Sequence, residues 1–367
     1  MNAGKQGMKL VQNASLLSGS ILLVLILGEV AARIWLPAPL PWLYPQLRYR
    51  PDSVLIFTLV PGQHSFTANV PVAINERGLR GSLVSYERES DEPRLLLLGD
   101  SIVFGYGVAD AEIVSSRVAA LLSSNPKAQI VNAGIPSYNT EQEVEFLRDE
   151  GIRYHPDWVI VGFCWNDLSD KSGVTVDRNG MLVSAGAAEP NRLQLLMQSK
   201  TGYELRNTFK KSRLLYSLSI LTSMLGAGGE QGGATNLRSE ILEGTSSTRV
   251  LEGWKRVAMS LSQLSELSKE HEFKVLVVAF PMLLSLEESH PKSSYPGELK
   301  SIASHLGLYF VDLEPVFKSR YRGRESLFLP YDPDHPNPAG HALAAEAIGN
   351  FIMEHSAVDS PQLRGGR

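Results

Sequence analysis

Four short polar segments of the chain hold the residue types that serine-based ester chemistry needs. Gly99-Asp100-Ser101, Asn132-Ala133-Gly134 and Asn166-Asp167 each follow an apolar run, and Asp332 precedes His335 by three residues in a Pro-rich loop. A serine becomes a nucleophile when a base removes its proton, and the base needs a carboxylate to orient it. The oxyanion formed by the attack needs preorganised N–H donors. The sequence therefore contains every part of such a site.

The residue types assign a role to each candidate. Ser101 is the candidate nucleophile, His335 the candidate base, and Asp332 or its neighbour Asp334 the orienting carboxylate. The candidate oxyanion donors are the N–H groups of Ser101 and Gly134 and the side-chain amide of Asn166. Each segment alone also fits a turn or a helix cap. Their joint occurrence after predicted strands favours catalysis.

The elements that must position these residues form a repeating pattern from residue 94 onward. Buried apolar runs alternate with amphipathic segments, which is typical of a parallel sheet covered by helices on both faces. The predicted strands are Leu95–Leu98, Gln129–Asn132, Trp158–Gly162, Lys274–Phe280 and Tyr309–Val311, and the predicted helices are Ala111–Ser123, Thr140–Gly151, Val250–His271, Glu298–Leu306 and Ala339–Glu354. Ligands of such sheets bind beyond the carboxyl ends of the strands. The sequence predicts a three-layer α/β/α domain with the candidate site at that edge.

Composition excludes several other classes of protein. The 367 residues include 35 Lys and Arg against 39 Asp and Glu, a net charge of −4. This balance argues against nucleic acid as a partner, because general nucleic-acid binding relies on dense positive charge. Cys164 is the only cysteine, which rules out an intramolecular disulfide and any Cys-based metal centre.

The N-terminus predicts export. Residues 10–28 carry no charge and follow two lysines, and about 20 helical residues span a bilayer. Glu29 and Arg33 come next at a spacing that lets them pair on one helix face. We predict a retained membrane anchor over residues 1–36; the alternative is a cleaved secretory signal with Val30-Ala31-Ala32 as its cleavage site. Both interpretations place the rest of the chain outside the cytoplasm, in a periplasmic or other extracytoplasmic compartment.

The rest of the chain divides by composition. The predicted segments are a Pro-rich connector over 37–52, a large domain over 53–358, an insertion in that domain at about 168–248, and a flexible tail over 359–367. Within the insertion, Asn179-Gly180 predicts a hairpin over 174–183. The glycine-rich stretch 226–236 predicts a mobile loop.

The polar segments also resemble a known family. Gly-Asp-Ser at 99–101, Asn-Ala-Gly at 132–134, Gly-x-x-x-Asn-Asp at 162–167 and Asp-x-x-His at 332–335 are similar, in order, to the blocks of the SGNH (GDSL-like) hydrolase superfamily. The resemblance covers residues 94–350 apart from the insertion. It implies a flavodoxin-like fold and acyl-ester chemistry without metal or cofactor.

Carried over by position, the resemblance implies Ser101 as nucleophile, His335 as base and Asp332 as its orienting carboxylate. Ser101, Gly134 and Asn166 would form the oxyanion hole. A looser resemblance links Ile74–Gly81 to membrane-anchored bacterial members, which are often associated with cell-envelope glycans.

These inferences lead to three functional hypotheses. The first is a membrane-anchored serine esterase that removes an acyl group, acetyl in the simplest case, from an envelope glycan or lipid. The second is an O-acyltransferase that uses the same acyl-enzyme, with a sugar hydroxyl in place of water and a membrane acyltransferase or acyl carrier as its partner. The third is a catalytically idle glycan-binding subunit.

Overall fold

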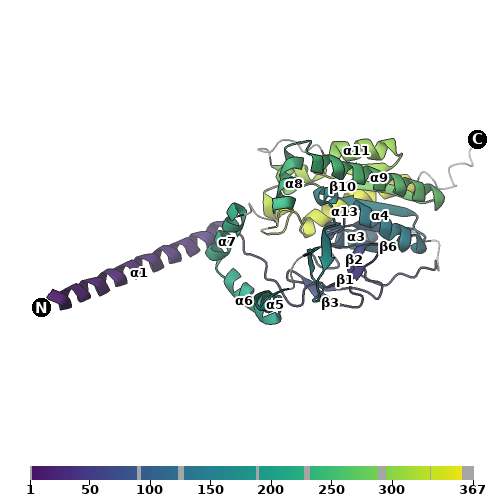
Figure 1. Ribbon diagram of the computed structural model, residues 1–367. Helices are drawn as coiled ribbons and strands as arrows, with labels where there is room; N and C mark the ends of the chain where they lie inside the picture. The colour runs from purple at the N-terminus through teal and green to yellow at the C-terminus, as the bar shows by residue number, and fades with distance from the viewer. Residues whose placement is uncertain are drawn as a thin grey trace, which may run out of the picture.

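Five parallel strands form the central sheet of the body (Figure 1). The computed structural model describes residues 2–88, 92–122, 128–186, 190–226, 232–287, 295–330 and 332–357. The sheet strands are β5 (Arg94–Gly99), β6 (Gln129–Gly134), β7 (Trp158–Phe163), β10 (Lys274–Ala279) and β11 (Tyr309–Asp312). Their order across the sheet is β11-β10-β7-β5-β6. Because β6 and β7 lie on opposite sides of β5, the direction of winding reverses there, and ligands bind at such switch points.

Alternating side chains of the buried strands supply two separate cores. Leu96 and Leu98 of β5 pack into one cluster, and Leu95 and Leu97 into the other, as the two-residue period of a strand requires. The first core is covered by α4 (Thr140–Asp149), α9 (Thr248–Glu270) and α11 (Tyr295–His305), and the second by α2 (Ser101–Phe104), α3 (Val114–Leu121), α12 (Glu314–Arg320) and α13 (Pro338–Ala357). The predicted α/β/α fold class is confirmed, and all five predicted strands are present with end shifts of one or two residues.

The segment before the sheet folds as two small hairpins. Strand β1 (Tyr49–Asp52) pairs with β2 (Ile56–Leu59), and β3 (His64–Thr67) pairs with β4 (Val70–Ala73). The last four residues of the predicted connector are therefore strand β1. The remaining short elements are η1 (Gly151–Tyr154), η2 (Trp165–Leu168), α10 (Leu283–Leu286) and η3 (Arg324–Ser326).

The insertion is mostly helical. The predicted hairpin is present as β8 (Val174–Val176) and β9 (Leu182–Ser184). It is followed by α5 (Arg192–Gln198), α6 (Lys200–Lys210), α7 (Arg213–Gly226) and α8 (Gly232–Leu242). The loop predicted over 226–236 is wrong at both ends, because Gly226 ends α7 and residues 232–236 begin α8; residues 227–231 lie outside the described residues.

Helix α1 (Asn2–Trp35) projects from the body as a single long rod (Figure 1). Its residues Ser15–Trp35, which include an 18-residue window of mean hydropathy 2.1, are long and apolar enough to cross a membrane, a property that secretory signals share. The connector after α1 is fixed to α6, since Trp42 and Asn207 exchange two hydrogen bonds and Lys210 donates to the Leu40 carbonyl. The predicted tail over 359–367 lies outside the described residues.

Candidate active site

Ser101 stands on the turn between β5 and α2. The Asp100 carboxylate caps the short helix by accepting the Ile102 N–H at 2.8 Å. Ser101 is the first residue of that helix, where a backbone N–H has no acceptor within the helix. A side chain at Gly99 would place its Cβ 2.2 Å from Val103 Cγ2, so glycine lets Val103 of α2 pack closely on the end of β5. The turn presents the hydroxyl of Ser101 at the sheet edge, within reach of His335.

His335 joins Ser101 to Asp332 across 234 residues of sequence. His335 Nε2 lies 2.8 Å from Ser101 Oγ, and His335 Nδ1 lies 2.7 Å from Asp332 Oδ2. The other Asp332 oxygen accepts the backbone N–H groups of Asp334 and His335, at 3.1 and 3.2 Å. The loop is further held because Leu329 N–H donates to the His335 carbonyl. The structure thus brings together the three residues predicted as nucleophile, base and orienting carboxylate.

The pKa values of His335 and Asp332 shift in the directions expected of an ion pair. Burial disfavours the imidazolium form of His335, but the Asp332 carboxylate and its hydrogen bond outweigh burial and raise the pKa of His335 above its usual value. Burial likewise opposes the charge of Asp332, yet His335 and two backbone N–H groups lower the pKa of that carboxyl. Asp332 therefore stays ionised beside the imidazole.

Asp334 lies in a different environment from Asp332, although the two are two residues apart. Its Oδ1 accepts the indole N–H of Trp165 at 3.2 Å and lies 3.3 Å from Arg238 Nη1. Burial raises the pKa of Asp334, with Arg238 acting in the opposite direction. Of the two candidate carboxylates, Asp332 is the one bonded to His335, while Asp334 connects the loop to α8 of the insertion.

The three predicted oxyanion donors come from neighbouring strand ends. Gly99 is paired with Gly134 on β6 and with Gly162 on β7, so Ser101, Gly134 and Asn166 follow adjacent strands. The Asn166 amide nitrogen donates to Asp100 Oδ2 at 2.7 Å, and the Gly134 N–H donates to Asn132 Oδ1 at 3.0 Å. Their role as oxyanion donors stays a prediction.

Gly134 also has a packing reason to be glycine. A Cβ at this position would lie 2.3 Å from the backbone nitrogen of Phe104, in the last turn of α2. The absence of a side chain therefore lets the nucleophile helix lie directly on β6.

Sequence reasoning missed Arg80, a fully buried side chain of the run 74–81. Its guanidinium donates to the carbonyls of Phe104 and Gly105 at 3.0 and 2.7 Å, and to that of Val108 at 2.7 Å. It also pairs with Asp110. Arg80 therefore fixes the loop that follows α2. The resemblance of residues 74–81 to a known run was the available signal.

Two further groups adjoin the relay and were missed in that role. The Tyr106 ring lies against His335 with centroids 4.9 Å apart. Arg238, 17% exposed, reaches the catalytic loop from α8. Neither position belongs to one of the four sequence blocks, and only the tertiary fold brings them to the site.

A buried acidic pair lies behind the site. Asp167 accepts the Cys164 N–H at 2.7 Å and the Thr140 hydroxyl at 2.9 Å, and burial raises its pKa to about 8. Burial raises the pKa of Glu143 well above its usual value, and neither of its carboxyl oxygens has a hydrogen-bond partner among the described residues. Burial therefore favours the neutral form of both carboxyls.

Comparison with known proteins gives a family match over most of the body. Residues 97–343 match the GDSL-like lipase/acylhydrolase family. An acetylxylan esterase from Geobacillus stearothermophilus is similar in structure at 19% identity, over 72% of this chain and 94% of that chain, with a TM-score of 0.41. A two-domain esterase active on acetylated mannans is similar at 17% identity, over 74% of this chain and 51% of that chain, with a TM-score of 0.40. The search of curated proteins found no match.

The matched region begins inside β5, just before Ser101, and ends in α13, after His335. It therefore contains all the candidate site residues, the end of β5 and the other four strands of the sheet. The chain belongs to the GDSL-like lipase/acylhydrolase family and is an ester-hydrolysing serine hydrolase.

Proposed function

We propose that this hydrolase is anchored in a membrane by α1 and removes acyl groups, acetyl in the first instance, from a glycan outside the cytoplasm. The observation that carries the catalytic part is the relay from Asp332 through His335 to Ser101, with distances of 2.7 and 2.8 Å. It stands at the winding switch point of the sheet, where this fold class binds ligands.

The proposed reaction uses Ser101 as the nucleophile. Ser101 Oγ attacks the ester carbonyl while His335 Nε2 takes its proton, and Asp332 stabilises the resulting imidazolium. The tetrahedral intermediate then loses the alcohol, which receives the proton from His335, and leaves an acyl-enzyme. Water attacks the acyl-enzyme as His335 takes a proton from it, and the proton returns to Ser101 when the acid leaves.

The three oxyanion donors do not contribute equally in this scheme. The Asn166 amide carries two N–H donors and gives one to Asp100, so the second remains for the substrate oxygen. Ser101 contributes an N–H that no helical carbonyl accepts. The single N–H of Gly134 is already bonded to Asn132 and would have to be shared. We therefore expect Ser101 and Asn166 to supply most of the stabilisation.

The surroundings of the relay support a sugar-bearing substrate. Trp165 and Tyr106 are both partly exposed, and each offers an apolar ring face with a polar tip. The Arg238–Asp334 pair adds charged hydrogen-bonding groups next to Trp165. Ring faces beside such groups suit the mixed polar and apolar surface of a sugar. The resemblance of Ile74–Gly81 to envelope-associated members agrees with this substrate class.

The junction between α1 and the body supports a retained anchor over a cleaved signal. Glu29 of α1 accepts the N–H groups of Arg213 and Leu214 and the hydroxyl of Ser212. Cleavage after Ala32 would remove Glu29 and leave these donors of α7 without that acceptor.

The test uses the full chain with an intact N-terminus, verified by mass spectrometry of the membrane fraction. The protein is incubated with p-nitrophenyl acetate and an acetylated oligosaccharide, and with a fluorophosphonate probe. We expect hydrolysis of both esters and labelling that Ser101→Ala abolishes and the exposed-site control Ser319→Ala leaves unchanged.

Three other results would overturn parts of the proposal. Acyl transfer to an added sugar in preference to water would identify an acyltransferase. Neither labelling nor hydrolysis would refute both enzymatic functions. An N-terminus beginning after Ala32 would refute the anchor alone.

A further inference from the structure

The face of the body from which α1 leaves is covered by α5, α6 and α7 (Figure 1). Exposed large apolar side chains gather on these helices. On α7, Leu215, Leu218 and Leu221 are 43%, 44% and 50% exposed. Because they are spaced by three residues, they form one broad apolar face of the helix. Leu205 and Phe209 of α6 are exposed as well.

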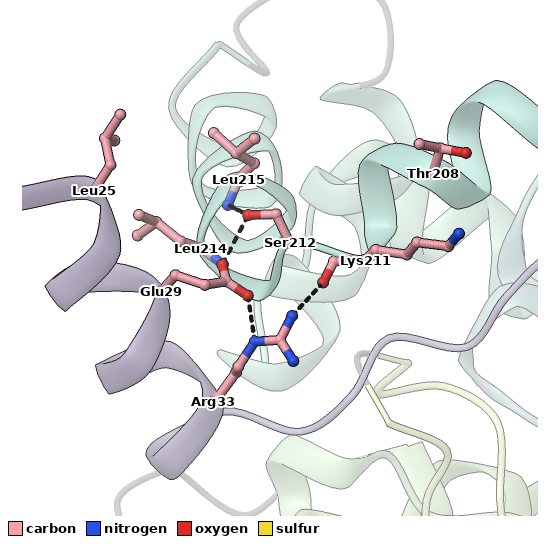
Figure 2. Close-up of a pocket in the computed structure, with 8 residues that line it drawn as sticks. All are labelled: Leu25, Glu29, Arg33, Thr208, Lys211, Ser212, Leu214 and Leu215. Atoms are coloured by element: carbon pink, nitrogen blue, oxygen red, sulfur yellow. Dashed lines mark hydrogen bonds and ion pairs between the residues drawn. The ribbon is translucent and has the colours of Figure 1, made fainter. Parts of the chain in front are cut away.

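Helix α7 is tied to the end of α1 by mutual capping (Figure 2). Glu29 of α1 accepts N–H groups of the first turn of α7, and Arg213 of α7 donates to the carbonyls of Arg33 and Leu36 at the end of α1. Arg33 in turn pairs with Glu29 and donates to the Lys211 carbonyl. These hydrogen bonds therefore fix the position of α7 along the axis of α1.

The residues of α1 that contact α7 lie in the half of the candidate span Ser15–Trp35 that is nearer the body. A Cβ at Gly28 would lie 2.9 Å from the Leu214 side chain, so Leu214 packs directly on the backbone of α1. If α1 spans a bilayer with its uncharged run 10–28 in the hydrocarbon core, the start of α7 lies at the level of Glu29 and Arg33, near the headgroups. An amphipathic helix at this level lies along the interface with its apolar face toward the acyl chains.

The pocket between the two helices has the two kinds of lining that a lipid needs. It has a volume of about 390 Å³, with Leu25, Leu214 and Leu215 on one part and Thr208 and Lys211 on another (Figure 2). Glu29, Arg33 and Ser212 lie between these two parts and are bonded to one another, so the Glu29 carboxylate is already paired with Arg33. No described residue pairs with the Lys211 ammonium group. Anionic headgroups are attracted to such cations close to the membrane surface.

We propose that α7 is an interfacial membrane helix, with Leu215, Leu218 and Leu221 against the acyl chains and Lys211 at the phosphate of an anionic lipid. This inference rests on the proposed anchoring by α1. It gives the insertion a role in holding the body on the bilayer, in addition to its contact with the catalytic loop through Arg238.

The test places the full chain in nanodiscs of phosphatidylcholine with one quarter phosphatidylglycerol. Single cysteines at Leu22→Cys, Leu218→Cys and Leu251→Cys carry an NBD dye, and the buried Cys164 of the unmodified chain serves as the labelling blank. Leu251 on α9 is the matched exposed leucine, at 55%. Retained esterase activity shows that each variant is folded.

We expect doxyl-labelled lipid to quench the dye at 22 and 218 and to leave 251 unquenched. Quenching at 22 without quenching at 218 would overturn the role of α7 with the anchor intact. No quenching at 22 would refute the anchor itself, and with it this inference. Disulfide cross-linking of Leu218→Cys between copies, without quenching, would assign the apolar face to a second copy and also overturn the proposal.

The lipid preference has its own control. With the dye at 218, doxyl-phosphatidylglycerol should quench more strongly than doxyl-phosphatidylcholine at equal mole fraction. Lys211→Gln should reduce this preference by up to about fivefold, the factor expected for one cation near an anionic surface. Lys269→Gln, on an exposed turn of α9, should leave it unchanged. An unchanged preference in Lys211→Gln would contradict the assignment of the headgroup site.

Discussion

The edge of the sheet around Ser101 and the insertion helices α5–α7 differ in what holds them. At the sheet edge, buried glycines, the Asp100 cap and the Arg80 guanidinium fix the backbone from several sides. On α5, no residue is buried, and α7 turns leucines outward. The sheet edge is therefore held by buried contacts within the chain, whereas the insertion leaves large apolar side chains exposed. Substitutions at the sheet edge should alter the catalytic rate. Substitutions in the insertion should alter substrate access to the site and the position of the body relative to the membrane.

The largest expected effect separates the two neighbouring carboxylates. Asp332→Asn should lower kcat/KM by about 10,000-fold, because an amide at this position favours the wrong imidazole tautomer. Asp334→Asn should lower it about tenfold or less, since Asp334 contacts Trp165 and Arg238 rather than the imidazole. Steady-state kinetics with p-nitrophenyl acetate measure both variants. Equal losses would show that the loop acts as one unit and that the distinction drawn between the carboxylates is wrong.

The next effect concerns the oxyanion. Asn166→Ala should lower kcat about 100-fold or more, the usual cost of removing one such donor. The exposed Asn350→Ala serves as the control. A rise in KM with unchanged kcat would mean that Asn166 binds the ground state and transition state equally, contrary to its assigned role.

A smaller effect tests the ion pair between Arg238 of α8, in the insertion, and Asp334 of the catalytic loop. Arg238→Met should reduce kcat/KM by about tenfold on an acetylated oligosaccharide and by less on p-nitrophenyl acetate, because α8 contacts the rim beside the proposed sugar site. Arg192→Met, exposed at the start of α5, should affect neither substrate. Equal losses on both substrates would show that Arg238 positions the Asp332–His335–Ser101 relay. The insertion would then contribute to catalysis as the sheet edge does.

The smallest effect is a shift in pH dependence. His335 must be unprotonated to act as a base, and its pKa is raised, so kcat/KM should fall as the pH drops through a value above about 6.5. The Asp334 carboxylate contributes to this rise. Asp334→Asn should therefore move the acidic limb to lower pH. A limb that moves to higher pH, or does not move, would contradict an electrostatic influence of Asp334 on the imidazole.

The sheet and the relay were accessible from the sequence for a local reason. Each strand is a continuous apolar run followed directly by polar residues, so its end could be located without knowledge of its neighbours. The pairing of Arg238 with Asp334 joins residues 96 positions apart on an irregular insertion, and no local pattern encodes it. Glu29 and Arg33 were predicted to pair, and they do, but the capping of α7 by Glu29 depends on how the insertion packs.

The docking of the connector on α6 limits which esters the active site can contact. If the Pro-rich connector were free in solvent, the distance between the hydrolase domain and α1 could vary widely. Leu40 and Trp42 are instead hydrogen-bonded to α6. With α1 in a bilayer, Ser101 would then lie at a fixed distance from the membrane surface. Substrate esters at that distance from the membrane would be hydrolysed, whereas identical esters farther from the membrane would not reach Ser101.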